Sequence, residues 1–199
     1  MKHYIDITLL PSDDIDVHLL WSKLMMQVHL ALVEIQDDNE QVPVAVSFPK
    51  YQTKSPDKLG FIGNKLRLFA NDKHDLERMN LGKWLNRLED YVHIKSITDV
   101  PNEVLGYESF NRRRKSGSPD KHIKRRMQRH NETREQAQKY FESYQMLKED
   151  KELPFIRMKS LHSDNAFRMS IVRKEATSSN SSVMFNTYGL SADGVLPKF

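Results

Sequence analysis

Over residues 1–100, apolar side chains follow two different spacings. Four segments are short and rich in apolar residues as strands are, namely residues 3–10, 42–48, 65–69 and 91–100, and Leu66 and Leu68 alternate with polar residues in the third. Two segments repeat apolar side chains every three or four positions as helices do, namely residues 17–34 and about 72–88. Asp16 can cap the first helix, and Asn71 or Asp72 the second. The resulting order, βαββαβ, predicts a ferredoxin-like domain over residues 1–100.

The remainder of the chain follows a different plan. Residues 101–110 are predicted to form a linker. Pro119 fits the first position of a helix that runs to about residue 130, and a second helix should reach about residue 149. Three strand-like stretches follow, namely residues 155–159, 167–172 and 183–188. The sequence therefore predicts an α+β protein whose second domain, residues 111–199, combines a basic helix with a small strand-rich region.

Composition excludes several classes of protein. Charged residues make up 29% and apolar residues 38% of the 199 residues, which is typical of a folded soluble chain. The chain has no cysteine, so a disulfide framework and a thiolate metal site are excluded. No apolar run approaches the ~20 residues of a membrane span, and the first ten residues lack the features of a secretory signal. We therefore expect a cytoplasmic protein.

The charge of this chain is concentrated in one segment. Residues 111–134 contain ten Lys and Arg side chains and two acids, a local charge of +8, whereas the whole chain carries only +4. The rest of the protein is therefore acidic, at −4. A basic block on an acidic body is typical of proteins that bind polyanions.

The predicted helix over residues 119–130 gathers its charge on one face. Lys121, Lys124, Arg125, Gln128 and Arg129 follow the spacing i, i+3, i+4, i+7, i+8. Such a face can lie along a nucleic-acid groove and meet successive phosphates. A solvated surface helix is the simpler alternative, and a membrane-surface helix would need a stronger apolar side. The length of the run and its scarcity of acids favour nucleic acid.

RNA is favoured over DNA by the predicted fold, because ferredoxin-like domains often bind RNA. Recognition on the sheet face uses aromatic residues on a central strand within a glycine-rich signature. The strand over residues 65–69 lacks that signature. We therefore expect the first sheet to support the RNA-binding parts of the protein, and not to contact bases itself.

Short motifs along the whole chain resemble those of one known family, and they occur in the same order and at similar spacing. They are Met1 to Ile7, Val28 to Val33, Val46 to Pro49, Met127 to His130, Leu153 to Phe155 with Ser160 and Asn165 to Arg168, and Thr187 to Ser191. The chain is similar to the type I-F CRISPR-associated pre-crRNA endoribonucleases, the hairpin-specific nucleases of the Csy complex. The resemblance implies a ferredoxin-like first domain and a second domain whose arginine-rich helix enters the major groove of the repeat hairpin.

The resemblance also implies an activity. The family cleaves once at the 3′ base of the stem without a metal ion, leaves a 5′-hydroxyl and a cyclic phosphate, and stays bound to the product. This chemistry is plausible for a protein without cofactors, since RNA supplies its own nucleophile, the 2′-hydroxyl. We expect neither a metal nor another cofactor, because the eight histidines are scattered without ligand spacing.

Three catalytic residues follow from the resemblance. His29 would be the general base, since the usual pKa of histidine lies near neutral pH. Ser160 would hold the 2′-hydroxyl, and Tyr188 would orient the imidazole. Without the resemblance, each has a plainer explanation: a structural histidine on an apolar helix, a serine at a strand end and an aromatic residue of the core.

RNA-binding roles follow in the same way. Arg112 and Arg114 match positions that contact bases low in the stem, where Arg114 replaces a glutamine of relatives and arginine can bind guanine through two hydrogen bonds. Phe167 matches an aromatic residue that stacks beneath the terminal base pair, or is otherwise a core residue. The remaining candidates for contacts to RNA are Lys121, Lys124, Arg125, Arg129, His130 and His162.

His162 departs from the family pattern, since relatives often carry serine at its position. It could contact the phosphate, compete with His29 as a base or lie on the surface. The expected partners of the protein are the CRISPR repeat hairpin and the other subunits of a type I-F surveillance complex. A non-cleaving RNA-binding subunit of the same fold and a DNA-binding regulator are the alternatives.

Overall fold

A computed structural model shows an α+β protein built on two antiparallel sheets. The structure describes residues 1–55, 60–113, 119–142, 153–160, 163, 165–176, 184–191 and 193–199. The first sheet has the strand order β3-β4-β1-β5, with β6 also paired to β1, and its strands are β1 (His3–Leu9), β3 (Ala45–Ser47), β4 (Lys65–Ala70), β5 (Val92–Ile94) and β6 (Thr98–Asp99). The second sheet has the order β11-β7-β9-β8, and its strands are β7 (Gly106–Arg113), β8 (Phe155–Lys159), β9 (Ala166–Ala176) and β11 (Leu196–Lys198).

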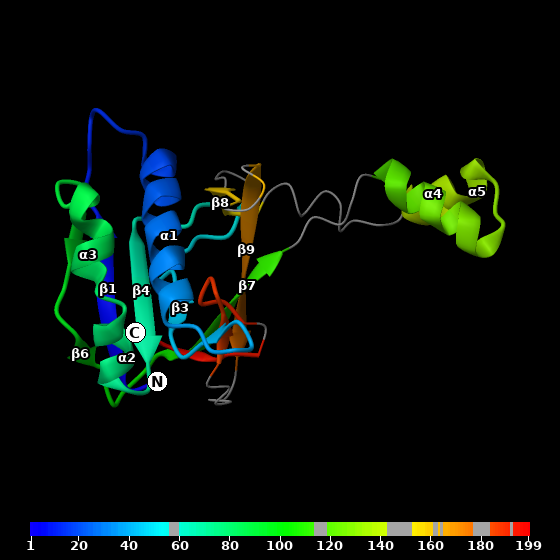
Figure 1. Cartoon of the computed structure of the whole chain (residues 1–199). Coiled ribbons are helices and arrows are strands. Elements are labelled where there is room, and N and C mark those ends of the chain that lie inside the picture. The colour runs from blue at the N-terminus through cyan, green and yellow to red at the C-terminus, as the bar shows by residue number, and fades with distance from the viewer. Residues whose placement is uncertain are drawn as a thin grey trace.

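The long helix α1 (Val17–Glu34) has the bounds that its apolar spacing predicts. Asp16 begins it by accepting a hydrogen bond from the backbone N–H of His18 at 2.8 Å. Its buried side chains recur at helical spacing and pack on the first sheet, and they are Leu20, Trp21, Leu24, Met25, Val28, Ala31 and Leu32. The other side of α1 lies along β8, so this helix stands between the two sheets (Figure 1).

Three predicted elements are interrupted in the structure. The second helix is divided into α2 (Lys73–Arg78), α3 (Leu81–Leu85) and a short 3-10 turn η1 (Asn86–Leu88), because Asn80 adopts a left-handed conformation with φ of 44°. The strand predicted over residues 42–48 is divided into β2 (Gln41–Val42) and β3 around Pro43, which has no N–H to donate. The strand predicted over residues 91–100 becomes β5 and β6, which pair with opposite ends of β1.

The linker prediction is wrong for residues 106–110, which form the first part of β7. This strand lies inside the second sheet, between β11 and β9. Its buried side chains are Glu108, Ser109 and Phe110, so a single large apolar residue faces the core. A strand with so few apolar positions does not show the alternation by which strands are recognised in a sequence. Arg112 and Arg113, the first two cations of the basic block, end the same strand.

The remaining elements of the second half agree more closely with the prediction from the sequence. The helix α4 (Pro119–His130) and strand β8 have the predicted bounds, and β9 is longer than predicted at both ends. The helix α5 (Arg134–Glu142) follows α4, and the predicted continuation to residue 149 lies outside the described residues. The last predicted strand shortens to β10 (Phe185–Asn186), which pairs with β2 and not with the second sheet.

One hydrophobic core joins the two sheets. The ring of Phe48, after β3, meets that of Phe110 on β7 edge-on at 5.3 Å. The hydroxyl of Tyr51 donates a hydrogen bond to the backbone oxygen of Ile171 on β9 at 2.9 Å. Because these contacts link residues far apart in the sequence, the two sheets hold a fixed relation around α1.

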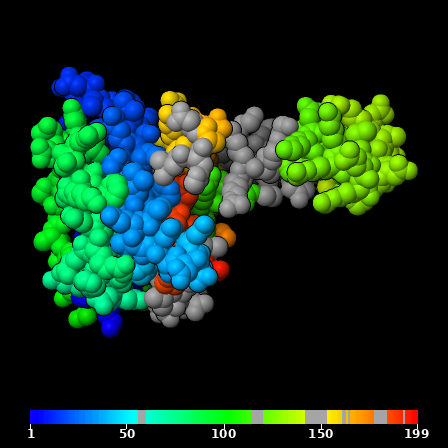
Figure 2. All heavy atoms as spheres, viewed as in Figure 1, coloured from blue at the N-terminus to red at the C-terminus, as the bar shows by residue number. Residues whose placement is uncertain are grey.

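The α4–α5 hairpin projects from the sheets on the side where β7 ends (Figures 1 and 2). Its exposed positions carry five of the ten cations of the basic block, namely Lys121, Lys124, Arg125, Arg129 and Arg134. Among the described helices, none is both long and apolar enough to cross a membrane.

Candidate functional site

A cavity of about 550 Å³ lies where α1, the end of β7 and the β8–β9 turn meet the segment after β10. It is lined by His29, Val33, Gln36, Glu40, Arg112, Lys159, Ser160, Phe167, Thr187 and Tyr188. Five residues singled out in the sequence are therefore brought to one place from five separate segments, namely His29, Arg112, Ser160, Phe167 and Tyr188.

The imidazole of His29 is held on two sides. Its Nδ1 lies 2.7 Å from the backbone oxygen of Thr187, and its ring stacks on that of Tyr188 at 4.2 Å with an angle of 9° between the planes. A carbonyl oxygen can only accept, so Nδ1 must carry the hydrogen. In the neutral ring, Nε2 then has the free lone pair that a general base requires.

The surroundings of His29 favour its neutral form. Burial lowers the pKa of the imidazole below its usual value of 6.5, and the positive charge of Arg112 lowers it further. The hydrogen bond to the Thr187 carbonyl opposes this shift without cancelling it. At neutral pH the His29 imidazole is therefore mostly in its neutral form, and its Nε2 can accept a proton.

A tight turn positions the segment that carries Thr187 and Tyr188. The side-chain oxygen of Asn186 accepts hydrogen bonds from the backbone N–H groups of Tyr188 at 2.9 Å and Leu190 at 3.2 Å. Gly189 has a φ of 70°, which favours glycine, and its carbonyl accepts a hydrogen bond from the N–H of Val46 on β3 at 2.7 Å. The turn is thereby fixed to the first sheet.

Ser160 lies at the turn between β8 and β9. Its N–H donates to the backbone oxygen of Asn165 at 2.9 Å, and its Oγ accepts a hydrogen bond from the N–H of Ser163 at 3.3 Å. These bonds hold the hydroxyl oxygen at the wall of the cavity. The hydroxyl hydrogen can then be donated to a polar group that enters the cavity.

Arg112 and Phe167 form the part of the cavity wall nearest the second sheet. The guanidinium carbon of Arg112 lies 4.7 Å from the centre of the Phe167 ring and 5.4 Å from that of Tyr188. Cations attract the faces of aromatic rings, so these contacts place a positive charge next to the His29–Tyr188 stack. The Phe167 ring is half-buried and part of it remains available for stacking.

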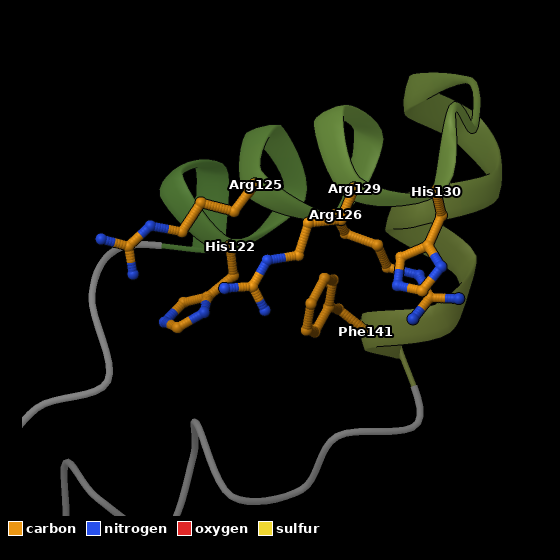
Figure 3. A pocket seen from close by; sticks show the side chains of 6 residues that line it. All are labelled: His122, Arg125, Arg126, Arg129, His130 and Phe141. Atoms are coloured by element: carbon orange, nitrogen blue, oxygen red, sulfur yellow. The ribbon is translucent and has the colours of Figure 1, made fainter.

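The predicted phosphate-binding residues lie apart from this cavity, on α4. Lys121, Lys124, Arg125, Arg129 and His130 are all exposed there. Arg125, Arg129 and His130 also line a second cavity of about 340 Å³ with His122, Arg126 and Phe141 (Figure 3). Arg114 and His162, the other two candidates, lie outside the described residues.

The sequence did not single out every residue of the cavity that contains His29. Thr187 contributes a backbone oxygen, which leaves no side-chain signal, although it precedes Tyr188 in a motif that pointed to this region. Lys159 lies next to Ser160 and could have been noticed for that reason. Within the part of the chain that the structure describes, no three His, Asp or Glu side chains gather in a group able to hold a metal ion.

Fold and site together define an α+β protein with an oriented, neutral histidine in a cavity and a separate cationic helix. The chain belongs to the family described as CRISPR-associated protein (Cas_Csy4), whose model matches residues 4–199. It is similar to the CRISPR-associated endonuclease Cas6/Csy4 of Escherichia coli (strain UTI89 / UPEC) and to that of Pseudomonas aeruginosa (strain UCBPP-PA14). Each relative is 28% identical over 199 residues, covering 100% of both chains.

A solved structure described as "An RAMP protein binding different RNA substrates" covers 99% of this chain and 99% of its own. Its TM-score of 0.34 and identity of 11% are too low to bear on the fold or the function of this protein.

Proposed function

We propose that this protein is an endoribonuclease that binds the stem-loop of a CRISPR repeat and cleaves at the 3′ base of the stem. Membership of the Cas_Csy4 family and the names of its relatives support the class of reaction. The observation that carries the proposal is the His29 imidazole, which is stacked, hydrogen-bonded at Nδ1 and neutral inside a cavity. Such a group can activate a hydroxyl nucleophile.

In the proposed reaction, Nε2 of His29 takes the proton from the 2′-hydroxyl of the nucleotide before the cut. The oxygen attacks the adjacent phosphorus, the bond from phosphorus to the 5′-oxygen breaks, and the departing 5′-oxygen takes a proton from water while His29 releases its own to solvent. The products are a 2′,3′-cyclic phosphate and a 5′-hydroxyl. Ser160 holds the attacking hydroxyl, and Tyr188 keeps the imidazole plane in place by stacking. Every group needed for this step is a side chain or the RNA itself, so we propose metal-independent cleavage.

Recognition of the hairpin is divided in this proposal between the cavity of His29 and the helix α4. Phe167 stacks beneath the last base pair of the stem, and Arg112 contacts a base next to it, so that the cut site enters the cavity of His29. The exposed cations of α4 bind phosphates along the major groove. Arg114 is proposed to contact a second base and His162 to contribute near the phosphate, on sequence grounds alone. Many phosphate contacts explain why the product would stay bound.

The arrangement of the first sheet supports a ferredoxin-like assignment for the N-terminal half. Its elements follow the order βαββαβ when β2 and β6 are set aside, and the strand order β3-β4-β1-β5 places the first and third of these strands at the centre. We further propose that the protein acts in the cytoplasm, and that its product is passed to the other subunits of a type I-F surveillance complex.

Cleavage in EDTA tests the proposal directly. We expect the protein to cut a repeat-hairpin RNA in EDTA, and to bind without cutting the same RNA that carries a 2′-deoxy nucleotide before the cut. Denaturing gels measure the fraction of RNA that is cleaved, and mass spectrometry identifies the cyclic phosphate. Cleavage of the deoxy substrate would rule out attack by the 2′-hydroxyl. Tight binding without cleavage of either RNA would favour a non-cleaving subunit.

The pH dependence of the rate reports on His29. Since burial and Arg112 lower the pKa of this base, the single-turnover rate should rise with pH, reach half its maximum below pH 6.5 and stay level at neutral pH. Arg112→Gln removes the nearby positive charge, so the pKa and the half-maximum should move to higher pH. Arg113→Gln removes the same charge at the next position of β7, which faces the opposite side of the sheet, and should leave the midpoint unchanged.

A further inference from the structure

Not every arginine of the basic block is directed outward. Arg126, on α4, donates from Nε to one carboxylate oxygen of Glu132 at 2.7 Å and from Nη2 to the other at 2.8 Å. Its guanidinium carbon lies 3.5 Å from the centre of the Tyr140 ring on α5. One side chain thereby links α4, the turn after it and α5. A bidentate ion pair of this kind also fixes the orientation of the guanidinium group.

The turn that this ion pair spans is built to reverse the chain. Asn131 has a φ of 51°, in the left-handed region. Thr133 and Gln136 then form a capping box at the start of α5. The N–H of Gln136 donates to Oγ1 of Thr133 at 3.3 Å, and the N–H of Thr133 donates to Oε1 of Gln136 at 2.9 Å. Glu132 stands between these two features, where its carboxylate can reach back to Arg126.

Apolar packing contributes little to this hairpin. Among the hairpin side chains that the structure describes, Ile123 and Ala137 are the buried apolar ones, so little apolar area is buried between the two helices. The Arg126 and Glu132 side chains are 22% and 24% exposed, so water only partly screens their attraction. The geometry of the hairpin therefore depends on the ion pair to an unusual degree.

We infer that Arg126 and Glu132 are positioning residues for RNA binding: their ion pair sets α5 against α4 and leaves Arg125 and Arg129 directed toward the RNA. This inference rests on the proposed function, in which α4 binds the hairpin. It removes Arg126 from the cations that touch phosphate, and it gives an acidic residue a favourable role in binding a polyanion.

A second ion pair on the same hairpin provides a matched control. Arg134 bonds to Asp120 at 2.7 Å, but these side chains are 55% and 67% exposed, where an ion pair contributes little. Glu132→Gln and Asp120→Asn each remove one negative charge and keep the shape of the side chain. If charge alone decided affinity, both variants would bind RNA more tightly.

The inference predicts opposite results for the two variants. Asp120→Asn should bind a stem-loop RNA as tightly as the wild type or slightly more tightly, whereas Glu132→Gln should bind about fivefold more weakly, the effect of losing a charge-assisted hydrogen bond. Dissociation constants from filter binding at one fixed salt concentration give the comparison. Tighter binding by Glu132→Gln would overturn the inference.

The double variant Arg126→Leu with Glu132→Leu tests whether Arg126 itself binds phosphate. An apolar pair of similar size can replace a half-buried ion pair, so affinity should return to within about twofold of the wild type. The slope of log affinity against log salt should also stay unchanged, whereas Arg129→Leu should reduce it by about one. A reduced slope in the double variant would mean that Arg126 touches RNA.

Hydrogen exchange in the protein without RNA separates this inference from the proposed function. Glu132→Gln should accelerate exchange of the backbone amides of α4 and α5, and Asp120→Asn should not. If the wild type bound no stem-loop RNA, the proposed function would fail, and the exchange result would still decide whether the ion pair orders the hairpin. Equal exchange in the two variants would reject the positioning role.

Discussion

His29→Ala should reduce the single-turnover cleavage rate about a thousandfold while leaving the affinity for the hairpin within about twofold of the wild type, since general-base catalysis contributes a factor of this size. The imidazole is the group in the described cavity that combines a free lone pair with a fixed orientation. In the proposed function the exposed cations of α4 bind the hairpin, so binding should survive the removal of the His29 side chain.

A rate measured with enzyme in excess over RNA checks this prediction, because it excludes slow product release from the measurement. His93→Ala is a matched control, since His93 is an exposed histidine on β5, in the first sheet. That variant should cleave at the wild-type rate. A large loss of affinity in His29→Ala with a parallel loss of thermal stability would instead assign His29 a structural role.

Gly189→Ala should destabilise the protein by about 3 kcal/mol, which corresponds to a decrease in Tm of about 10 °C. The left-handed backbone at Gly189 disfavours any side chain, and an added Cβ would lie 2.5 Å from Cγ2 and 3.0 Å from the backbone nitrogen of Val46. The turn must then move away from β3, and the carbonyl of Thr187 moves with it. We therefore expect the cleavage rate to fall even at temperatures where the variant is folded.

Gly82→Ala is the matched control for this substitution. Gly82 lies in α3, its φ is not positive, and a Cβ there would have no other atom within 4 Å. Alanine is favoured over glycine in a helix, so this variant should be unchanged or up to about 1 kcal/mol more stable. Differential scanning calorimetry and single-turnover assays on both variants give the comparison. Wild-type cleavage by folded Gly189→Ala would show that the turn does not position His29.

Local patterns in the sequence determined those elements whose stability comes from nearby residues. The bounds of α1 follow from the Asp16 cap and an uninterrupted apolar face, and those of α4 from Pro119 and the cationic spacing. The division of the second helix was missed because Asn80 in a left-handed conformation has no distinct local signal. Strand β7 was missed because Phe110 is its single large buried apolar side chain, so the segment lacks the alternation that marks a strand.

The sequence also determined the charge of the basic block, but it did not determine which of these cations bind other side chains of the protein. Counting residues gave ten cations in this segment, and the motifs and the helical spacing selected Arg112, Arg114, Lys121, Lys124, Arg125 and Arg129 as candidates for RNA contacts, without showing what the other four contact. The structure shows Arg126 bound to Glu132, Arg134 bound to Asp120 and Arg112 in the wall of the His29 cavity. Ion pairs form between side chains that folding brings together, and a count along the chain does not record them.

The sequence by itself determined that this chain folds as an α+β protein, carries a basic helix and shares its motifs with one family. It supplied His29, Ser160 and Tyr188 as candidates through those motifs, without a reason for their proximity. Only the tertiary structure decided that α1, the β8–β9 turn and the turn after β10 meet at one cavity, and that Thr187 orients His29 through a backbone oxygen. The physical reason is that helical spacing and charge are local properties, whereas a catalytic arrangement depends on packing between distant segments.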